Sequence, residues 1–240
     1  MPPHDQLFKQ LLETFFGDLL RLVAPEQAAR LCLEEVRFLD KETFTDLPRG
    51  QRREVDLLAE VPAIDPPGEA VLVHVEIEAV ARRGMPRRLW RYYLQLQLRH
   101  GRPVFPLVVN LRGGRPGVTR GTFSTRVLDS EVARFHYTTF GLAGCRAEDY
   151  LARPEPLAWG LAALMSPAHM RPAEHKIACL QAIAKARLGE VEEFLLGNCV
   201  ETYLLSSGQR RMSEQGLQTI HLQRLGGSSA ELTSFQPPDE

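Results

Sequence analysis

The chain has 240 residues, and its 29 lysine and arginine residues nearly balance its 30 aspartate and glutamate residues. This length suits one large domain, or one domain with an appendage. The balanced charge excludes binding to nucleic acid through overall charge, so any such binding requires a local basic patch. The N-terminus lacks a signal-peptide pattern and no apolar run reaches membrane-spanning length, so we expect a cytoplasmic protein with no membrane segment.

The four cysteines are scattered along the chain, at Cys32, Cys145, Cys179 and Cys199, and no two form a C-x-x-C pair. This spacing argues against a structural zinc site and against a disulfide framework. We therefore expect free thiols in a reducing compartment.

The first quarter of the chain predicts helices followed by a strand. Apolar residues recur at helical spacing over residues 5–22, and Pro25 begins a short helix over 25–30. Residues 35–40 read as a strand. Residues 41–51 are polar and carry a Pro-Arg-Gly turn signal, which is typical of a loop.

Two acidic strands follow, over residues 53–61 and 71–79, and the proline-rich stretch between them can close a hairpin. Residues two apart share a face of a strand, so Glu76 and Glu78 lie together, and pairing of the strands brings Asp56 to them. Three carboxylates so placed repel one another unless protons or a cation intervene. A hard divalent ion such as Mg²⁺, which prefers oxygen ligands, satisfies this arrangement. The alternative is a row of ordinary solvent-facing charges.

The rest of the chain alternates helix and strand and then becomes helical. Residues 85–100 predict a helix that ends at Gly101, residues 104–111 a buried strand, and residues 132–140 a further strand. Helical periods then cover 157–165, 173–186 and 190–205, and residues 206–240 predict a disordered tail. This order predicts an α/β fold with helices covering a central sheet.

The predicted helix over 85–100 lies in the only dense basic cluster, which consists of arginines 82, 83, 87, 88, 91, 99 and 102. On that helix Arg88, Tyr92, Gln95 and Arg99 align at near-helical spacing. Such a stripe can follow a DNA backbone through salt-sensitive phosphate contacts. The alternative is a solvated helix face whose arginines pair with nearby acids.

Several blocks, in this order, resemble the PD-(D/E)XK nuclease superfamily. Within it the chain is similar to the recombination-promoting nuclease and putative transposase group, also called YhgA-like. The blocks are His4-Asp-Gln-Leu-Phe-Lys9, Arg53-Glu-Val-Asp56, His74-Val-Glu-Ile-Glu-Ala79, Met85-Pro-Arg-Arg-Leu-Trp-Arg-Tyr92 and Pro103-Val-Phe-Pro-Leu-Val-Val109. The resemblance covers residues 4–140 and extends more loosely to about residue 205.

The resemblance implies a restriction-endonuclease-like core over residues 1–140, in the order helix, three strands, helix, strand, with a mixed central sheet flanked by helices. Residues 141–205 would form a helical extension packed on that core. The implied function is a Mg²⁺-dependent DNA endonuclease linked to recombination or a mobile element, with Mn²⁺ as a possible substitute. Many members of the superfamily form homodimers, so a homodimer is an open expectation.

The resemblance also implies residue roles. Asp56 and Glu76 would be metal ligands, together with the backbone carbonyl of Ile77. Lys9 and Glu13 are accessory candidates on the first helix. For Arg88, Tyr92 and Gln95 the implied roles are contact with DNA or support of the site.

One position departs from the family pattern. Glu78 stands where the superfamily places lysine and this group commonly places glutamine. An ionised glutamate cannot donate a hydrogen bond, but it can act as a base or ligate a second ion. The competing hypothesis is therefore a catalytically degenerate nuclease-fold protein that binds DNA or a protein partner. A third hypothesis is a hydrolase of RNA or of small nucleotides with the same metal geometry.

Overall fold

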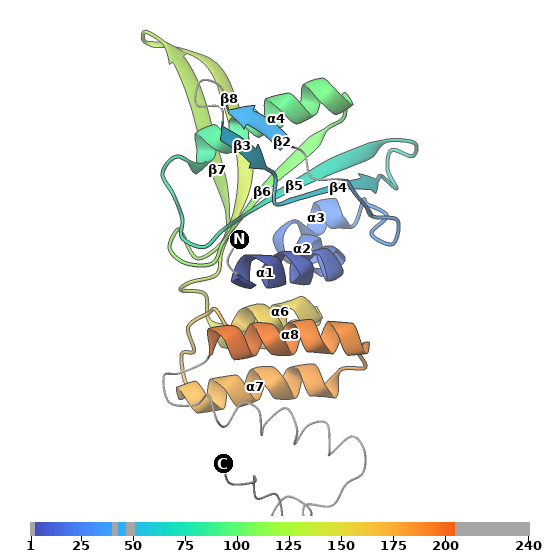
Figure 1. The fold of residues 1–240 in the computed structure, drawn as a ribbon, viewed down its shortest axis with the longest axis vertical. Helices are drawn as coiled ribbons and strands as arrows, with labels where there is room; N and C mark the ends of the chain where they lie inside the picture. Colours follow the sequence, from blue (N-terminus) through green and yellow to red (C-terminus); the bar gives the residue numbers. More distant parts are fainter. Residues whose placement is uncertain (1–2, 40–42, 47–50, 205–240) are drawn as a thin grey trace, which may run out of the picture.

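The computed structural model describes residues 3–39, 43–46 and 51–204 (Figure 1). Its helices are α1 (Pro3–Thr14), α2 (Phe16–Val23), α3 (Pro25–Ala28), α4 (Met85–His100), α5 (Ala147–Leu151), α6 (Pro156–Ala162), α7 (Pro172–Lys185) and α8 (Glu190–Tyr203). Its strands are β1 (Arg37–Phe38), β2 (Thr43–Asp46), β3 (Gln51–Glu54), β4 (Leu57–Pro62), β5 (Ala70–Glu78), β6 (Val104–Asn110), β7 (Gly117–Val127) and β8 (Ser130–Gly141). The tail predicted over 206–240 lies outside the described residues.

The centre of the molecule is a mixed six-stranded sheet in the order β1-β4-β5-β6-β8-β7. β4 and β5 are antiparallel, whereas β5, β6 and β8 run parallel to one another, and β7 returns antiparallel beside β8. α4 makes the crossover from β5 to β6, as a parallel pair of strands requires. The predicted α/β class, with a mixed sheet between helices, is confirmed.

Helices cover both faces of this sheet, because the side chains along each strand point alternately to one face and to the other. Val73 and Val75 of β5 belong to the main core, which also contains the apolar residues of α1 and α2. On the opposite face, Leu72 packs with Tyr92 and Leu96 of α4. Odd-numbered and even-numbered residues of β5 therefore pack in two separate apolar layers, one on each face of the sheet.

The C-terminal helices pack against the N-terminal helices. α8 contacts α1, α6 contacts α2, and α7 lies beyond α6 and α8 (Figure 1). One apolar cluster runs from Val109 in the sheet through Leu12 of α1 to Leu161 and Leu196 of α6 and α8. The four cysteines are free thiols, as predicted.

Three predictions about the elements are wrong in detail. The helix predicted over 5–22 is two helices separated at Phe15, whose backbone leaves the helical region (φ −106°, ψ 35°). Residues 41–51, read as a loop, contain β2 and the first residue of β3. β7 was not predicted, because its exposed residues alternate with half-buried ones and form no apolar run.

The acidic strand predicted over 53–61 is also interrupted, since β3 ends at Glu54 and β4 begins at Leu57. Val55 packs with Leu58 and Tyr92 on the α4 side, so the alternation changes phase at the bend that contains Asp56. Asp56 is therefore a residue between strands, and its side chain is directed by the bend and not by strand alternation.

Leu161→Ala should lower the free energy of unfolding by about 2–5 kcal/mol, because Leu161 is fully buried in the cluster that joins α6 to the sheet. Leu98→Ala is the matched control, since Leu98 is 88% exposed on α4, and its effect should stay within about 0.5 kcal/mol. Urea unfolding followed by circular dichroism measures both. A separate early transition in Leu161→Ala, with the remainder as stable as wild type, would contradict a single shared core.

Candidate functional site

The site lies on the face of β5 that α4 covers. His74, Glu76 and Glu78 share this face and are 0%, 2% and 5% exposed. Strand β4 pairs with β5 only as far as Leu57 opposite Val75, so the last three residues of β5 extend past the start of β4. Their other neighbour is β6, where Glu78 lies in register with Asn110.

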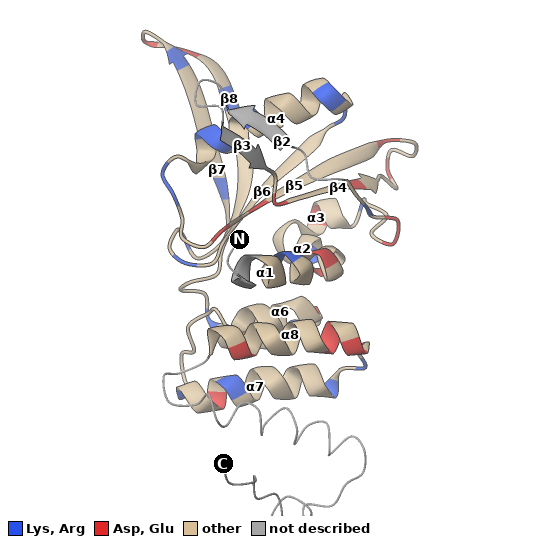
Figure 2. Cartoon of the chain, in the orientation of Figure 1, with Lys and Arg blue, Asp and Glu red and all other residues tan. Residues whose placement is uncertain are grey.

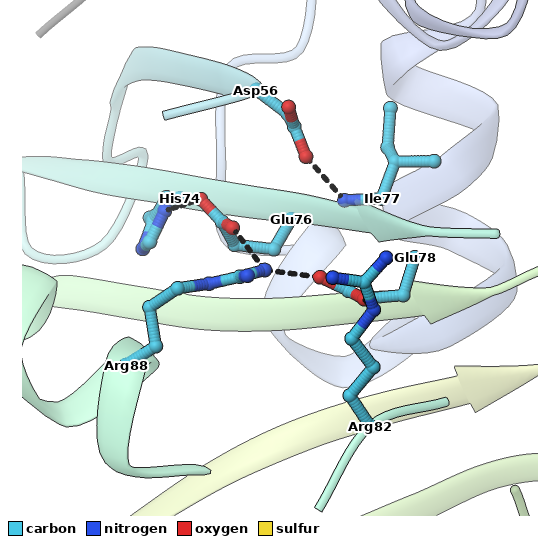
Figure 3. Close-up of polar contacts among 7 residues, drawn as sticks. All are labelled: Asp56, His74, Glu76, Ile77, Glu78, Arg82 and Arg88. Carbon is cyan, nitrogen blue, oxygen red and sulfur yellow. Dashed lines mark hydrogen bonds and ion pairs between the residues drawn. The ribbon is translucent and has the colours of Figure 1, made fainter. Parts of the chain in front are cut away.

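Arg88 of α4 reaches both glutamates (Figure 3). Its Nη2 donates to Oε2 of Glu76 at 3.0 Å and also to Oε1 of Glu78. The Nε atom of Arg82 lies 3.3 Å from the second oxygen of Glu78. On the other side, Nε2 of His74 lies 2.9 Å from Oε1 of Glu76, and the tautomer with its proton on Nε2 donates to that oxygen.

These contacts offset the free-energy cost of burying the charges of Glu76 and Glu78. An unpaired carboxylate in an apolar setting is strongly unfavourable, so two adjacent buried glutamates require cations or protons. Burial alone would lower the pKa of Arg88, but the negative charges of Glu76 and Glu78 outweigh it and raise that pKa. Arg88 is therefore charged at any physiological pH, and it holds the two carboxylates together.

Asp56 approaches the same strand from its edge. Its Oδ2 atom accepts a hydrogen bond of 2.8 Å from the backbone N–H of Ile77. The carbonyl of Glu78 accepts from Leu111 on the β6 side, and successive strand residues point their backbone groups to opposite edges. The carbonyl of Ile77 therefore leaves β5 on the same edge as Asp56.

The pKa of Asp56 depends on its burial and on the charge of Glu76. Burial raises the pKa of Asp56 from 3.8 to about 6, and the charge of Glu76 adds to the increase. The hydrogen bond from Ile77 and the positive charges of Arg88 and Lys9 act in the opposite direction. The charge of Glu76 thus disfavours the ionised form of Asp56, and a bound cation would relieve that repulsion.

The remaining predicted residues divide into near and distant ones. Lys9 of α1 lies 3.9 Å from Glu13, and the positive charge of Lys9 lowers the pKa of Asp56. Among the described residues, Glu13 is linked to the site through this ion pair with Lys9. The ring of Tyr92 packs edge-on against His74, with 5.6 Å between the centroids. Gln95 is exposed on α4, outside the acidic cluster.

Strand alternation placed His74 on the acidic face, as a hydrogen-bonded structural histidine or as a group near the phosphate, whereas sequence reasoning did not connect Arg82 with the glutamates. Both residues contact the glutamates. The signal was in their spacing. His74 lies two residues before Glu76 on one strand and therefore shares its face. Arg82 lies four residues after Glu78, but only the turn that follows β5 brings its guanidinium back to that carboxylate.

The oxygen donors suit a hard cation by chemical type. Across the described ranges 3–39, 43–46 and 51–204, no group of three or more His, Cys, Asp or Glu side chains is placed to hold a metal ion. Mg²⁺, however, commonly takes only one or two carboxylates and completes its shell with waters and substrate phosphates. The carboxylates of Asp56 and Glu76 and the carbonyl of Ile77 are a donor set of that kind, and Mn²⁺ accepts the same ligands.

Comparison with protein-family models, with curated proteins and with solved structures finds no match for this chain. The resemblance to PD-(D/E)XK nucleases thus rests on the sequence blocks quoted above. Within the residues that the structure describes, no helix is both long and apolar enough to cross a membrane.

Asp56→Asn should stabilise the protein at pH 8 in metal-free buffer by about 3 kcal/mol. The folded-state pKa of about 6 exceeds the unfolded value of 3.8, so the native state keeps a proton that the unfolded chain has lost. The stability of the wild type therefore falls as pH rises from about 4 to about 6, and the advantage of the variant disappears below about pH 4.

Urea unfolding at a series of pH values measures this difference. Asp129→Asn, at an exposed aspartate in the turn between β7 and β8, is the control and should show no such pH dependence. Equal stability of Asp56→Asn and wild type at every pH would show that Asp56 is not destabilised by its surroundings.

Proposed function

We propose that the chain is a divalent-metal-dependent hydrolase of phosphodiester bonds in DNA, built on a restriction-endonuclease-like core. The observation that carries the proposal is the convergence of Asp56, Glu76 and the Ile77 carbonyl where β5 extends past β4. The order α1, antiparallel β4 and β5, crossover helix α4, parallel β6 supports the same family.

In this proposal Asp56, Glu76 and the Ile77 carbonyl hold the ion. When bound, the ion lowers the pKa of a water molecule to supply the nucleophile and polarises the scissile phosphate. Binding requires Glu76 to exchange part of its contact with His74 or Arg88 for the ion. His74 keeps Glu76 oriented, since its Nε2–H donates to one carboxylate oxygen.

Glu78 acquires a role that the family pattern does not provide. It pairs with Arg88, which therefore lies beside Glu76 at the place where a lysine would otherwise supply positive charge. A guanidinium is charged throughout the physiological range and presents a planar set of donors to phosphate oxygens. Glu78 is then a positioning residue, and Arg88 is the group that stabilises negative charge on the phosphoryl oxygens.

The charge of the chain supports DNA as the substrate. Residues 79–146 contain thirteen arginines and only two acidic residues, Asp129 and Glu131. Figure 2 shows basic residues on α4, on the β7–β8 hairpin and on the loop before β7, whereas acidic residues are frequent on α8. This part of the chain therefore carries a large excess of positive charge beside the acidic site, as phosphate-backbone binding requires.

A second candidate is a non-catalytic protein that keeps the fold and binds DNA or a protein. The ion pairs of Arg88 and Arg82 with the glutamates favour it, because they neutralise the carboxylates without any metal. A buried charge network of this kind can serve to fix α4 on the sheet. The two candidates differ in whether Asp56 and Glu76 bind a metal ion.

Supercoiled plasmid DNA should be nicked by the wild-type protein with Mg²⁺ or Mn²⁺ and left intact with EDTA. Glu76→Gln should slow nicking by at least about a hundredfold, because it removes a ligand charge while it keeps the shape of the side chain. Glu69→Ala, at an exposed glutamate before β5, should cleave like wild type. Absence of cleavage with either ion by folded protein would favour the non-catalytic candidate.

Mn²⁺ should raise the melting temperature of the wild type and should not raise that of Asp56→Asn, because the variant lacks one of the two carboxylate ligands. Differential scanning fluorimetry at pH 7.5 over a range of Mn²⁺ concentrations measures both. Asp149→Asn, at an exposed aspartate of α5, should respond like wild type. An equal shift in all three proteins would place Mn²⁺ binding elsewhere.

A further inference from the structure

A polar cavity adjoins the acidic site. Its volume is about 260 Å³, and it lies between the start of α4, the end of β6 and the strands β7 and β8. Met85 and Pro86 of α4 line it, together with Asn110 and Tyr137. Glu78 and Asn110 are in register on neighbouring parallel strands, and Arg82 both lines the cavity and pairs with Glu78.

Asn110 is the feature that points to a ligand. Asn110 is only 7% exposed and lines the cavity, and none of the hydrogen bonds between side chains of the described residues involves its amide. The amide of Asn110 is not among the fully enclosed polar groups that lack a partner, so it opens onto the cavity, where it can donate to or accept from a ligand. Gly114 lies against this amide, since a Cβ on it would be 3.5 Å from Nδ2.

The charge of the lining specifies an anion. The described residues around the cavity include three arginines, at positions 82, 115 and 120, and no acidic residue. The cavity also receives the N-terminal end of α4, whose first turn contains no acidic side chain and no side-chain cap. The partial positive charge of a helix N-terminus adds to that of the arginines.

The walls supply further hydrogen-bonding groups. The hydroxyls of Thr119 and Thr139 lie 2.6 Å apart across the β7–β8 pair, and both residues line the cavity. Burial raises the pKa of Tyr137, so its phenol stays protonated and can donate. Gly121 is required opposite Tyr137, because a Cβ there would collide with the ring.

From these observations we infer that this cavity binds a phosphate group, with the Asn110 amide and the guanidinium of Arg115 as its main donors. The inference rests on the proposed function for the identity of the ligand, a nucleic acid whose neighbouring phosphate would lie at the acidic site. Affinity for a phosphate group can be measured without that assumption. Arg82 links the two places, since it can pair with Glu78 or with the bound anion.

The test is calorimetric titration of the full chain with inorganic phosphate in EDTA. Asn110→Leu and Arg115→Ala should each weaken binding by about tenfold. Asn110→Leu should keep the stability of the fold, because no side-chain hydrogen bond of Asn110 to another described residue is lost. Arg126→Ala is the matched control, as Arg126 is an exposed arginine of β7 outside the cavity, and its effect should stay below about twofold.

Wild-type affinity in both test variants would overturn the inference, and so would an equal loss in Arg126→Ala. Anisotropy titrations with a short DNA duplex and with thymidine monophosphate separate the sources of phosphate. Loss of duplex affinity in Asn110→Leu and Arg115→Ala supports nucleic acid, whereas loss for the mononucleotide alone overturns that identity.

Phosphate binding in the cavity and nuclease activity are tested by different experiments. Glu76→Gln should bind phosphate like wild type, because Glu76 does not line the cavity. Phosphate binding with the expected variant pattern, in a protein that leaves plasmid DNA intact, would support the pocket and overturn only the nuclease proposal.

Discussion

The structure depends on how two adjacent carboxylates are neutralised inside the protein. Glu76 and Glu78 are buried between β5 and α4, and Arg88 pairs with both. Removal of Arg88, or of the glutamates that it pairs with, would leave an uncompensated charge buried in the protein. The loss in stability would be far larger than that from the loss of a surface ion pair. The ion pairs therefore fix the position of α4 on the sheet, and α4 in turn makes the crossover that places β6 beside β5.

The local break in the first acidic strand has a chemical consequence. Because β4 begins one residue after Asp56, the end of β5 has no continuous partner on that edge, and the Ile77 N–H is paired by the Asp56 carboxylate. A continuous strand would have placed backbone groups there. The bend thus leaves a carboxylate and a carbonyl at one edge of β5, next to Glu76, and these are the oxygen ligands that the proposed function uses.

The acidic site lies between a positively charged residue of α1 and the polar cavity around Asn110. On one side the fold brings α1 to the sheet, so that the positive charge of Lys9 reaches Asp56. On the other side, the end of β6 and residues of β7 and β8, with the loop after β5 and the start of α4, form the polar cavity around Asn110. Acidic and basic groups are thereby adjacent, and Arg82 joins them, since it pairs with Glu78 and also lines the cavity.

Local pattern in the sequence was enough to determine the α/β class, the helix α4, the buried strand β6 and the common face of Glu76 and Glu78. Each of these follows from a period of two or 3.6 residues, which depends only on backbone geometry. The break at Asp56, the strand β7 and the partners of the glutamates were decided by tertiary structure. Asp56 is turned toward Ile77 by packing of Val55 against α4, and Arg82 meets Glu78 only after a turn. Asn110 reads in the sequence as the end of an apolar strand, and it becomes a candidate ligand-binding group only when β7, β8 and α4 enclose it. The physical reason is that period and propensity act between neighbours in the chain, whereas charge pairing and enclosure act between residues that only the folded chain brings together.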